Sequence, residues 1–453
     1  MRTKSTQQPC LGIRRESSVK IIQEHQRKYD RFDEILRENP AIVNRVHGDL
    51  KNTLSTSPKG RGGDYTSEEI LRCLIVMFVE GDSYRGVVIR IDESEFLRGF
   101  VSLGWKPMMD FTFLSRAFGC LSPESWEFIN GSFGAYALDT EKIKGDWLRV
   151  DTTVCETNVH YPTDASLLWD GYRVLARLLR AVRRELSVPM SYRFHERKTK
   201  RLVLTIARSN KSTNKKRQRR VKSQYRQLLE KVKRLVELAR EVAPQLTGLS
   251  FGREELLQYA GLVERVMYQT EKRVFEGIHI PVEEKVLSLF EPHTELLKRG
   301  KTAKPTEFGH MVLIGQSREK FITQYQVMEK QINETQLVDG ILEAHKKGFE
   351  RLPRVLAADK GFYESMTKID ELRKKIQVVS IGKKGKRNPR EARREKTKSF
   401  KEGQRFRAGI EGSISVLKRA FGLTRCLFKG FRNYASGVGC AIFCHNLVLL
   451  ART

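Results

Sequence analysis

One stretch decides the fold of this chain: Leu148-Arg149-Val150-Asp151-Thr152-Thr153-Val154-Cys155-Glu156-Thr157-Asn158-Val159-His160. Its alternation and its β-branched residues are typical of a half-buried β-strand. Asp151 stands inside this strand, and a carboxylate that faces a core is costly unless a positive group or hydrogen-bond donors satisfy it. An arginine, a cap or a divalent metal ion could do so. Our hypothesis is a metal ion that two later acids, Asp359 and Glu411, also bind.

Composition indicates a soluble globular protein with a polyanionic partner. The 453 residues suffice for two or three structural units, and 40% of them are hydrophobic. The formal net charge of +30 points first to nucleic acid and second to an anionic membrane. The seven cysteines are odd in number and mostly scattered, which favours reduced thiols in a cytoplasmic protein over a disulfide framework.

An apolar run near the C-terminus, residues 437–451, holds Cys440, Cys444 and His445. These three residues could bind a metal ion, but a buried helix is the better interpretation. The run has 15 residues and includes polar ones, so we expect it to be too short and too polar to span a bilayer. The N-terminus lacks the apolar segment of a signal peptide. We therefore expect a cytoplasmic location.

Residues 1–140 predict an all-helical N-terminal domain. Helices are expected at 19–36, from Thr66 to Phe78, and at 82–90, 110–119 and 122–131. Thr66 and Glu69 are spaced as a capping box, and Ser122-Pro123 supplies a cap and a first-turn proline. The functional interpretation, binding of DNA ends or dimerisation, and the alternative of a plain packing domain are equally favoured.

Residues 166–280 predict a basic helical insertion. Residues 211–240 contain twelve lysines and arginines but only two glutamates. The apolar residues Val221, Tyr225, Leu228, Val232, Leu235 and Ala239 follow the 4-3 spacing of a coiled-coil seam, so we expect a hairpin whose returning helix spans 256–266. The basic residues form either a solvated helix face or, as the charge excess favours, a surface that follows DNA. Those singled out as DNA-binding are Lys215, Lys216, Arg217, Arg219 and Arg220.

After residue 281 the pattern alternates between strands and helices. Strands are expected at 307–315, 321–327, 354–359 and 376–381, and helices at 335–347 and 363–374. With the opening strand they predict an α/β fold, a mixed sheet with helices packed on it, in the order of a ribonuclease-H-like core over 145–165 and 281–453. In that order the opening strand and strand 354–359 are adjacent. Asp151 and Asp359 should therefore lie together at one edge of the sheet.

The chemistry of such a site follows from its charges. Two carboxylates at one site repel and one pKa rises, whereas Mg²⁺ prefers oxygen ligands and resolves the repulsion. Two such ions roughly 3.5–4 Å apart can activate a water or a 3′-hydroxyl in phosphoryl transfer. Glu411 offers the third acid, because Arg407, Glu411 and Lys418 are spaced to project from one helical face. The alternative is an ordinary surface helix with an (i, i+4) Arg–Glu pair.

The three acids lie in three segments: Val150-Asp-Thr-Thr-Val154 running into Asn158-Val-His-Tyr-Pro-Thr-Asp164, then Leu356-Ala-Ala-Asp-Lys-Gly-Phe-Tyr363, and Arg407-Ala-Gly-Ile-Glu-Gly-Ser-Ile-Ser-Val-Leu-Lys418. In these segments the chain resembles the DDE transposases of bacterial insertion sequences, most closely the ISNCY group, from about residue 60 to the C-terminus. The resemblance implies that the three acids are catalytic and bind two Mg²⁺ ions, which Mn²⁺ can replace. It also implies that Arg407 and Lys418 contact the DNA end. Gln404 stands where the family often has a tyrosine, a departure that bears on a DNA contact but not on the metal ligand.

A second basic segment, from Lys383 to Arg407, contains twelve cations and three glutamates. With its glycines and proline it predicts a mobile loop that becomes ordered on DNA. The residues singled out in it as DNA-binding are Lys383, Lys384, Lys386 and Arg387.

The resemblance implies a transposase that binds the terminal inverted repeats of its own element and joins them to target DNA. Its expected partner is double-stranded DNA, and it would act as a homodimer or higher oligomer at the bacterial nucleoid in the cytoplasm. No membrane and no small-molecule substrate is expected. The alternatives are a catalytically inactive DNA-binding derivative and a structure-specific nuclease of the same fold. Glu156 and His160 receive no role.

Overall fold

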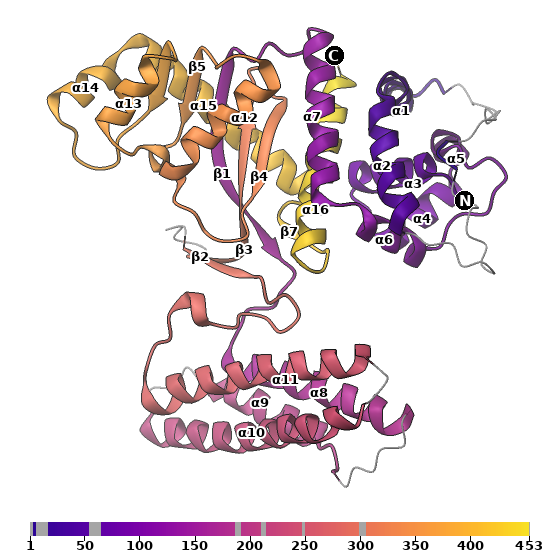
Figure 1. Cartoon of the computed structure of the whole chain (residues 1–453), viewed down its shortest axis with the longest axis vertical. Coiled ribbons are helices and arrows are strands. Elements are labelled where there is room, and N and C mark those ends of the chain that lie inside the picture. Colours follow the sequence, from indigo (N-terminus) through magenta and orange to yellow (C-terminus); the bar gives the residue numbers. More distant parts are fainter. Residues whose placement is uncertain are drawn as a thin grey trace. The chain divides into compact units, whose positions relative to one another are not determined.

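The structure is a computed structural model that describes residues 3–5, 17–53, 65–185, 192–209, 214–246, 250–298 and 305–452. The chain divides into two compact units, Met1–Thr157 with Gly309–Thr453, and Asn158–Phe308. The first unit combines helices with most of a mixed β-sheet, and the second is largely helical (Figure 1). The expectation of an α/β fold is confirmed.

Seven helices precede the first strand in the described part of the chain. They are α1 (Lys20–Glu38), α2 (Pro40–Thr53), α3 (Ser67–Glu80), α4 (Tyr84–Glu93), α5 (Glu95–Val101), α6 (Phe111–Cys120) and α7 (Pro123–Asp139). The predicted capping box begins α3: the Glu69 N–H donates to Thr66 Oγ1 at 3.1 Å, and the Thr66 N–H donates to Glu69 Oε2 at 2.8 Å. Ser122 caps α7, with Pro123 in its first turn. Local sequence signals therefore fix where these helices begin.

The sheet has seven strands: β1 (Trp147–Thr157), β2 (Glu295–Lys298), β3 (Thr306–Gln316), β4 (Ile322–Val327), β5 (Val355–Ala358), β6 (Val378–Ile381) and β7 (Arg425–Cys426). Its order is β2-β3-β1-β5-β6, with β4 paired to β3 and β7 to β1. β1 runs antiparallel to β3 and parallel to β5, so the sheet is mixed. Every residue of β1 is buried, as expected for a strand covered on both faces. The opening stretch is therefore the centre of the sheet.

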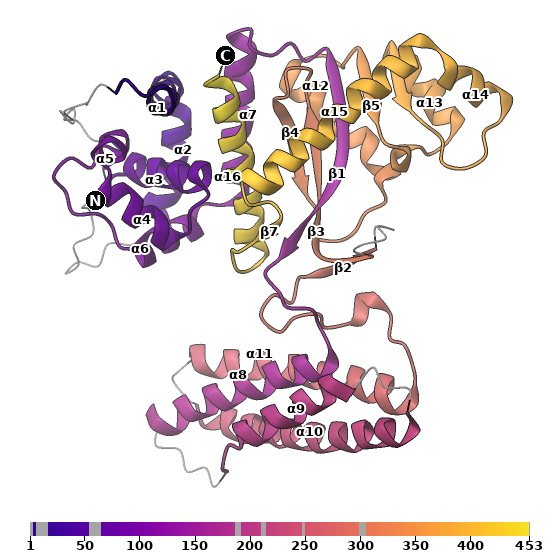
Figure 2. The same cartoon turned by 180° about the vertical axis from the view of Figure 1, so that it is seen from behind.

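Helices cover both faces of this sheet. The turn η4 (Glu334–Leu337) leads into α12 (Val338–Phe349), and η5 (Lys360–Phe362) precedes α13 (Met366–Arg373). Residues of α12 and α13 share a core with Leu148 and Val150 on one face of β1 (Figure 1). α15 (Lys398–Ala420) crosses the other face, over β1, β5 and β6 (Figure 2). Because side chains alternate along a strand, Asp151 faces the side of α15.

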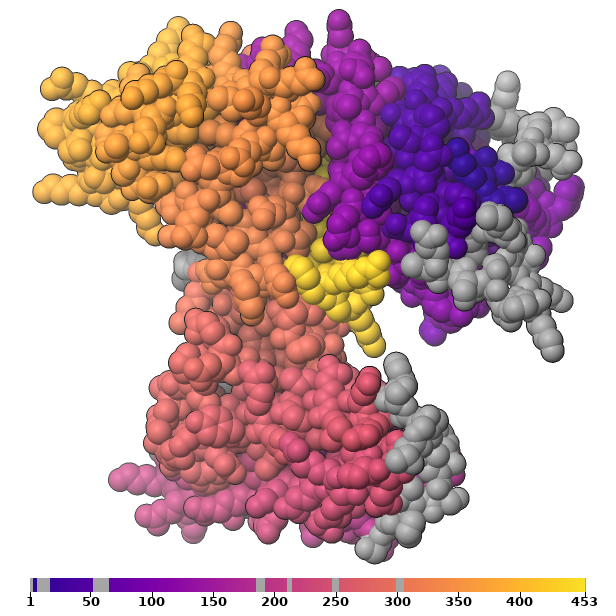
Figure 3. Space-filling model, viewed as in Figure 1, coloured from indigo at the N-terminus to yellow at the C-terminus, as the bar shows by residue number. Residues whose placement is uncertain are grey.

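The expectation of a loop from Lys383 to Arg407 is wrong for most of that segment. Helix α14 spans Pro389–Lys396, and α15 begins at Lys398. Asn388 and Glu391 form a capping box for α14, and buried Arg394 donates to the carbonyl oxygens of Val379 and Ile381. The loop prediction gave the many charges of this segment more weight than the capping residues of α14. The segment lies at the outer surface of the first unit, coloured gold in the space-filling view (Figure 3).

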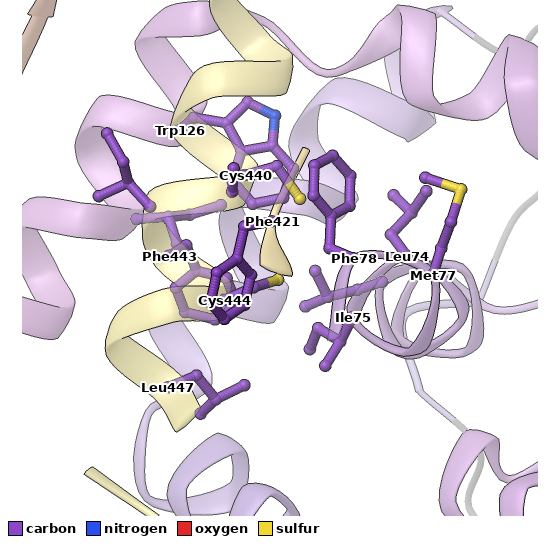
Figure 4. Packing of buried hydrophobic residues seen from close by; sticks show 14 of the residues in the cluster. Leu74, Ile75, Met77, Phe78, Trp126, Phe421, Cys440, Phe443, Cys444 and Leu447 are labelled. Atoms are coloured by element: carbon purple, nitrogen blue, oxygen red, sulfur yellow. The ribbon is translucent and has the colours of Figure 1, made fainter. Parts of the chain in front are cut away.

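The N-terminal helices share one hydrophobic core with the sheet and with α16 (Phe431–Leu450). Figure 4 shows Phe78 of α3, Trp126 of α7 and Phe443 of α16 within this core. α7 and α16 lie side by side, and a Cβ at Gly439 would come within 2.6 Å of the Trp126 Cβ. Glycine therefore permits the close approach of the two helices.

Helix α16 is a core helix. Among the described residues it alone is long and apolar enough to cross a membrane by length and composition, and 83% of its most apolar window is buried. It has 20 residues, so the expectation from a 15-residue run that it is too short was wrong. The buried-helix interpretation is confirmed: Cys440 and Cys444 are fully buried, and Asn446 pairs with both backbone groups of Ile322. The described cysteines are free thiols, and Cys10 lies outside the described residues.

The second unit is built on α8 (Asp164–Glu185), α9 (Glu196–Ser209), α10 (Lys215–Val242) and α11 (Ser250–Glu271). Short turns η1 (Ala243–Gln245), η2 (Lys272–Glu276) and η3 (Val282–Glu284) join or follow them. The six residues of the expected seam are buried, but α10 packs against α8 and α9 as well as α11. The region is therefore a cluster of four helices and not a two-helix hairpin. Additional buried residues such as Leu229 and Val236 widen the apolar face of α10 beyond one seam.

Candidate active site

Asp151 lies in the centre of the sheet and has two polar partners. Its side chain is 11% exposed. The Thr152 N–H donates to Oδ1 at 2.8 Å, and Nη2 of Arg407 donates to Oδ2 at 2.9 Å. Burial raises the pKa of Asp151, and the Arg407 guanidinium opposes this rise. The sequence left an arginine, a cap or a divalent metal ion open as the partner of this acid, and in the structure Arg407 is that partner.

Asp359 follows the neighbouring strand directly. In the parallel pairing of β1 and β5, Val150 is opposite Ala358, so the next residues are the two acids. The expectation that the two acids are brought together by adjacent strands is confirmed, but their placement at one edge of the sheet is wrong, because β1 and β5 are both interior strands. Asp359 directly precedes the turn η5, and its side chain is 48% exposed. Solvent therefore reaches the second acid more readily than the first.

Glu411 and Arg407 come from one face of α15. Nη1 of Arg407 donates to Oε1 of Glu411 at 3.2 Å, one helical turn away. Nη2 of Arg407 also lies 3.8 Å from Oδ1 of Asp359. The Arg407 side chain is 18% exposed and that of Glu411 is 67% exposed. One guanidinium thus contacts all three candidate acids.

Two side chains, those of Arg149 and Gln404, join α15 to the sheet by hydrogen bonds, a role that the sequence did not reveal. Arg149 of β1 donates to Gln316 Oε1 and to the carbonyl oxygen of Phe406, each at 2.8 Å. Burial lowers the pKa of Arg149 to about 10. Gln404 donates to the Ser380 carbonyl oxygen at 2.6 Å. The departure from tyrosine at position 404 therefore places a hydrogen-bond donor where α15 meets the sheet.

Glycine lets this helix approach closely. A Cβ at Gly409 would clash with Nη1 of Arg149, and a Cβ at Gly403 would come within 2.5 Å of the Ser380 Cβ. The distance between α15 and β1 sets how far Arg407 reaches toward Asp151. The geometry of the three acids therefore depends on residues that are not acidic.

The donor set suits a hard divalent cation, although Arg407 stands among the donors. Mg²⁺ prefers oxygen ligands, and the three carboxylates supply such ligands. Within the described residues, no three acidic, histidine or cysteine side chains are placed to hold a metal ion as they stand. Nε of Arg407 is buried and lacks a hydrogen-bond partner, so the guanidinium is incompletely satisfied. The residues fit a cation chemically, provided that Arg407 withdraws.

Comparison with known families gives a match for part of the chain. Residues 292–447 match the family described as "Transposase DDE domain". Residues 292–447 of this chain are therefore similar to a transposase DDE domain. The resemblance to DDE transposases is confirmed, and a transposase function in general is supported; assignment to the ISNCY group stays a prediction. Neither curated proteins nor solved structures gave a match.

The matched range contains Asp359 and Glu411 but not Asp151. β1 nevertheless lies between β3 and β5 in the sheet, and both of these strands are inside the match. The sheet that contains the matched strands β3 and β5 is therefore completed by a strand outside the matched residues. The match implies a ribonuclease-H-like core, in agreement with the mixed sheet and its helices on both faces.

Lys418 is not among the groups that meet at Arg407. It lies about two turns beyond Glu411 on α15, and its carbonyl oxygen accepts from Thr424 Oγ1 at 2.8 Å. Among the basic residues near α14, Lys383 contacts both carboxylate oxygens of Glu391, and Arg387 pairs with Glu395. Lys384 and Lys386 are exposed on the first unit. In the second unit, the five basic residues that begin α10 are exposed.

The two residues that the sequence left without a role have structural partners. Glu156 is buried and forms an ion pair with Arg425 at 3.3 Å. His160 contacts Asp170 at 2.6 Å, and Asp170 also binds Arg173. The hydrogen bond to Asp170 raises the pKa of His160. Neither residue is among the groups that contact Asp151 or Arg407.

Proposed function

We propose that this protein is a DNA transposase that recognises the terminal inverted repeats of its own insertion sequence, cleaves DNA there and transfers the strand to target DNA. One observation carries the proposal. Asp151 comes from the central strand, Asp359 directly follows the adjacent strand and Glu411 comes from α15, and all three contact one cationic group. Asp359 and Glu411 also lie within the residues that match the transposase family.

In this proposal Asp151, Asp359 and Glu411 hold two Mg²⁺ ions, or Mn²⁺ in their place. When bound, the metal supplies a lowered pKa for the attacking water or 3′-hydroxyl and charge stabilisation for the leaving oxygen. The side chain of Arg407, displaced from the acids, would meet a phosphate of the DNA end together with Lys418. Arginine suits that contact because its planar fork binds phosphate in a bidentate manner.

The remaining DNA contacts are assigned to two exposed basic segments. Lys215, Lys216, Arg217, Arg219 and Arg220 begin α10, and the other segment contains Lys383, Lys384, Lys386 and Arg387. Such contacts supply affinity that is independent of sequence and sensitive to salt. Lys384 and Lys386 are favoured in the second segment, since Lys383 and Arg387 already pair with glutamates.

The test uses the full chain and duplex DNA carrying the element's ends. With Mg²⁺ the wild-type protein should nick these ends, and Asp151→Asn, Asp359→Asn and Glu411→Gln should each reduce cleavage at least a hundredfold while binding the same DNA. Cleavage by Asp151→Asn at the wild-type rate would refute the assignment. Binding without cleavage by the wild type would identify an inactive derivative. Cutting of branched DNA regardless of end sequence would identify a nuclease.

The proposal also places the protein on double-stranded DNA at the nucleoid, in the cytoplasm, as a homodimer or higher oligomer. Joining two ends to one target requires two copies of the site, which is the reason for expecting an oligomer. Sedimentation of the protein with and without end DNA checks this. A monomer on DNA carrying both ends would contradict it.

A further inference from the structure

Glu334 lies behind the two acids of the sheet, on the opposite side from α15. Along β1, Asp151 contacts Arg407 of α15, whereas the preceding and following side chains point away from that helix. Val150 belongs to the core shared with α12 and α13. Thr152 is 3% exposed, and its Oγ1 donates to Oε1 of Glu334. A fourth acid therefore reaches the residue that directly follows Asp151.

The position of Glu334 is fixed by its local structure. It is the first residue of η4, which begins after Asn333 and continues into α12. The Asn333 side chain accepts from the Thr335 N–H at 3.2 Å, as an N-cap does. Leu337 and Val338, just beyond, are buried in the same core as Val150. The carboxylate of Glu334 is thus presented from an anchored turn and not from a free loop.

The second oxygen of Glu334 lies against the turn that carries the other acid. A Cβ at Gly361 would clash with Oε2 of Glu334 and would lie 2.9 Å from its Cδ. Gly361 is two residues after Asp359 and in the middle of η5. It is not one of the glycines with positive φ, so its backbone would accept another residue. The space taken by Glu334, and not the backbone conformation, is what requires glycine here.

We propose that Glu334 is a positioning residue for Asp151 and Asp359. One carboxylate oxygen binds the strand beside the first acid, and the other packs against the turn that follows the second acid. Glu334 thereby sets the separation of the two acids from behind, without contacting their carboxylates. The functional meaning of this spacing rests on the proposed function, because the acids are assigned there as metal ligands.

Metal affinity is the appropriate measurement, since groups that orient ligands change it without acting in the chemical step. Replacing such a group costs roughly ten- to a hundredfold in metal affinity. The probe is Mn²⁺ alone, added to the full-length protein without DNA and followed by electron paramagnetic resonance. Glu334→Ala should weaken binding at least tenfold. Glu334→Gln keeps an acceptor for Thr152 and should stay within about threefold of the wild type.

Thr152 provides a matched pair of variants. Thr152→Val removes the hydroxyl and should weaken Mn²⁺ binding about as much as Glu334→Ala, whereas Thr152→Ser keeps the hydroxyl and should restore it. Gly361→Ala should weaken binding too, because the new methyl group displaces Glu334. When Gly361→Ala is added to Glu334→Ala, it should weaken Mn²⁺ binding by less than a further twofold, because the Glu334 carboxylate that the methyl group would meet is no longer present.

The outcomes separate this inference from the proposed function. If wild-type protein shows no Mn²⁺ site that Asp151→Asn removes, the proposed function fails. If that site exists and Glu334→Ala binds Mn²⁺ as tightly as the wild type, the positioning role is overturned. The contact between Glu334 and Gly361 is tested independently of metal by the thermal midpoints of four proteins: the wild type, Glu334→Ala, Gly361→Ala and the double variant. Additive shifts in those midpoints would overturn it, and a double variant more stable than Gly361→Ala alone would support it.

Discussion

Removal of Arg407 tests whether this side chain neutralises Asp151, Asp359 and Glu411 in the absence of metal. The three contacts of its guanidinium are unequal. The pair with Asp151 is hydrogen-bonded at 2.9 Å between side chains that are 18% and 11% exposed. The pair with Asp359, at 3.8 Å, is too long for a hydrogen bond. The pair with Glu411 is an (i, i+4) contact to a largely exposed carboxylate.

The magnitude follows from the exposure of each pair. Exposed helix pairs contribute about 0.3–0.5 kcal/mol, so the Glu411 contact adds little. Removing one partner of a buried pair costs about 3–5 kcal/mol, because the other charge stays buried. Since both side chains retain some exposure, we expect Arg407→Ala to lower the free energy of unfolding by about 2–4 kcal/mol. Asp151→Asn combined with Arg407→Ala should recover part of this loss, because the amide carries no charge.

Urea unfolding with and without a divalent cation measures both effects. In 10 mM Mn²⁺, an order-of-magnitude excess over a sub-millimolar site, Arg407→Ala should regain more stability than the wild type, because the cation no longer competes with a guanidinium. Arg405→Ala, an exposed arginine on the same helix, is the control and should change stability by less than about 0.5 kcal/mol. An Arg407→Ala protein that is as stable as the wild type without metal would refute the reasoning. So would an equal response of both proteins to Mn²⁺.

Three further predictions concern the rest of the chain. His345 is buried against the Gly145 carbonyl oxygen, and burial lowers the pKa of His345 to about 4. Its contribution to the free energy of unfolding is therefore fully present above about pH 6.5, and this free energy should fall by up to about 3 kcal/mol as the pH drops toward 4. His345→Gln should lose this part of the acid sensitivity in unfolding experiments at several pH values. Gly409→Ala should destabilise the protein by about 1–3 kcal/mol, because the new Cβ would meet Arg149. Gly412→Ala is the control: the space around its Cβ is open, so this change should be neutral or stabilise the protein by up to about 1 kcal/mol. Equal effects of the two variants in thermal unfolding would contradict this prediction. Replacing Lys216 and Arg220 by alanine should weaken DNA binding on all sequences. The slope of log affinity against log salt, measured by fluorescence anisotropy, should become shallower by about one for each phosphate that is no longer neutralised. An unchanged slope would exclude α10 from the interface.

Local signals made several elements of the first unit predictable from the sequence. The alternation of residues 148–157 defines β1, and the capping residues Thr66 and Ser122 define the starts of α3 and α7. The adjacency of Asp151 and Asp359 followed from the order of strands, because the parallel pairing of β1 and β5 brings the end of the short β5 beside the middle of β1. These features depend on neighbours in the chain or on a small set of allowed topologies.

What the sequence did not predict depends on contacts between distant segments. Arg407 and Asp151 are 256 positions apart, so spacing along α15 predicted its partner Glu411 but not Asp151. The role of Gln404 is set by carbonyl oxygens at the ends of two strands. The basic segment before α15 was mistaken for a loop because charge density outweighed the capping box of Asn388 and Glu391. In each case tertiary context decided the outcome.

The residues beside the acids divide into two sets by the face of the sheet that they serve. On the side of α15, Arg149 and Gly409 set how closely the helix approaches β1, and so where Arg407 and Glu411 lie. On the other side, Thr152 and Gly361 meet Glu334. The two sets act from opposite faces of β1, so their effects on metal affinity should be multiplicative. A combined Thr152→Val and Gly409→Ala protein whose loss in Mn²⁺ affinity equals the product of the single losses would show that the acids are positioned from both faces independently. A markedly smaller loss would mean that β1 shifts as one body and that the two faces are coupled through the strand.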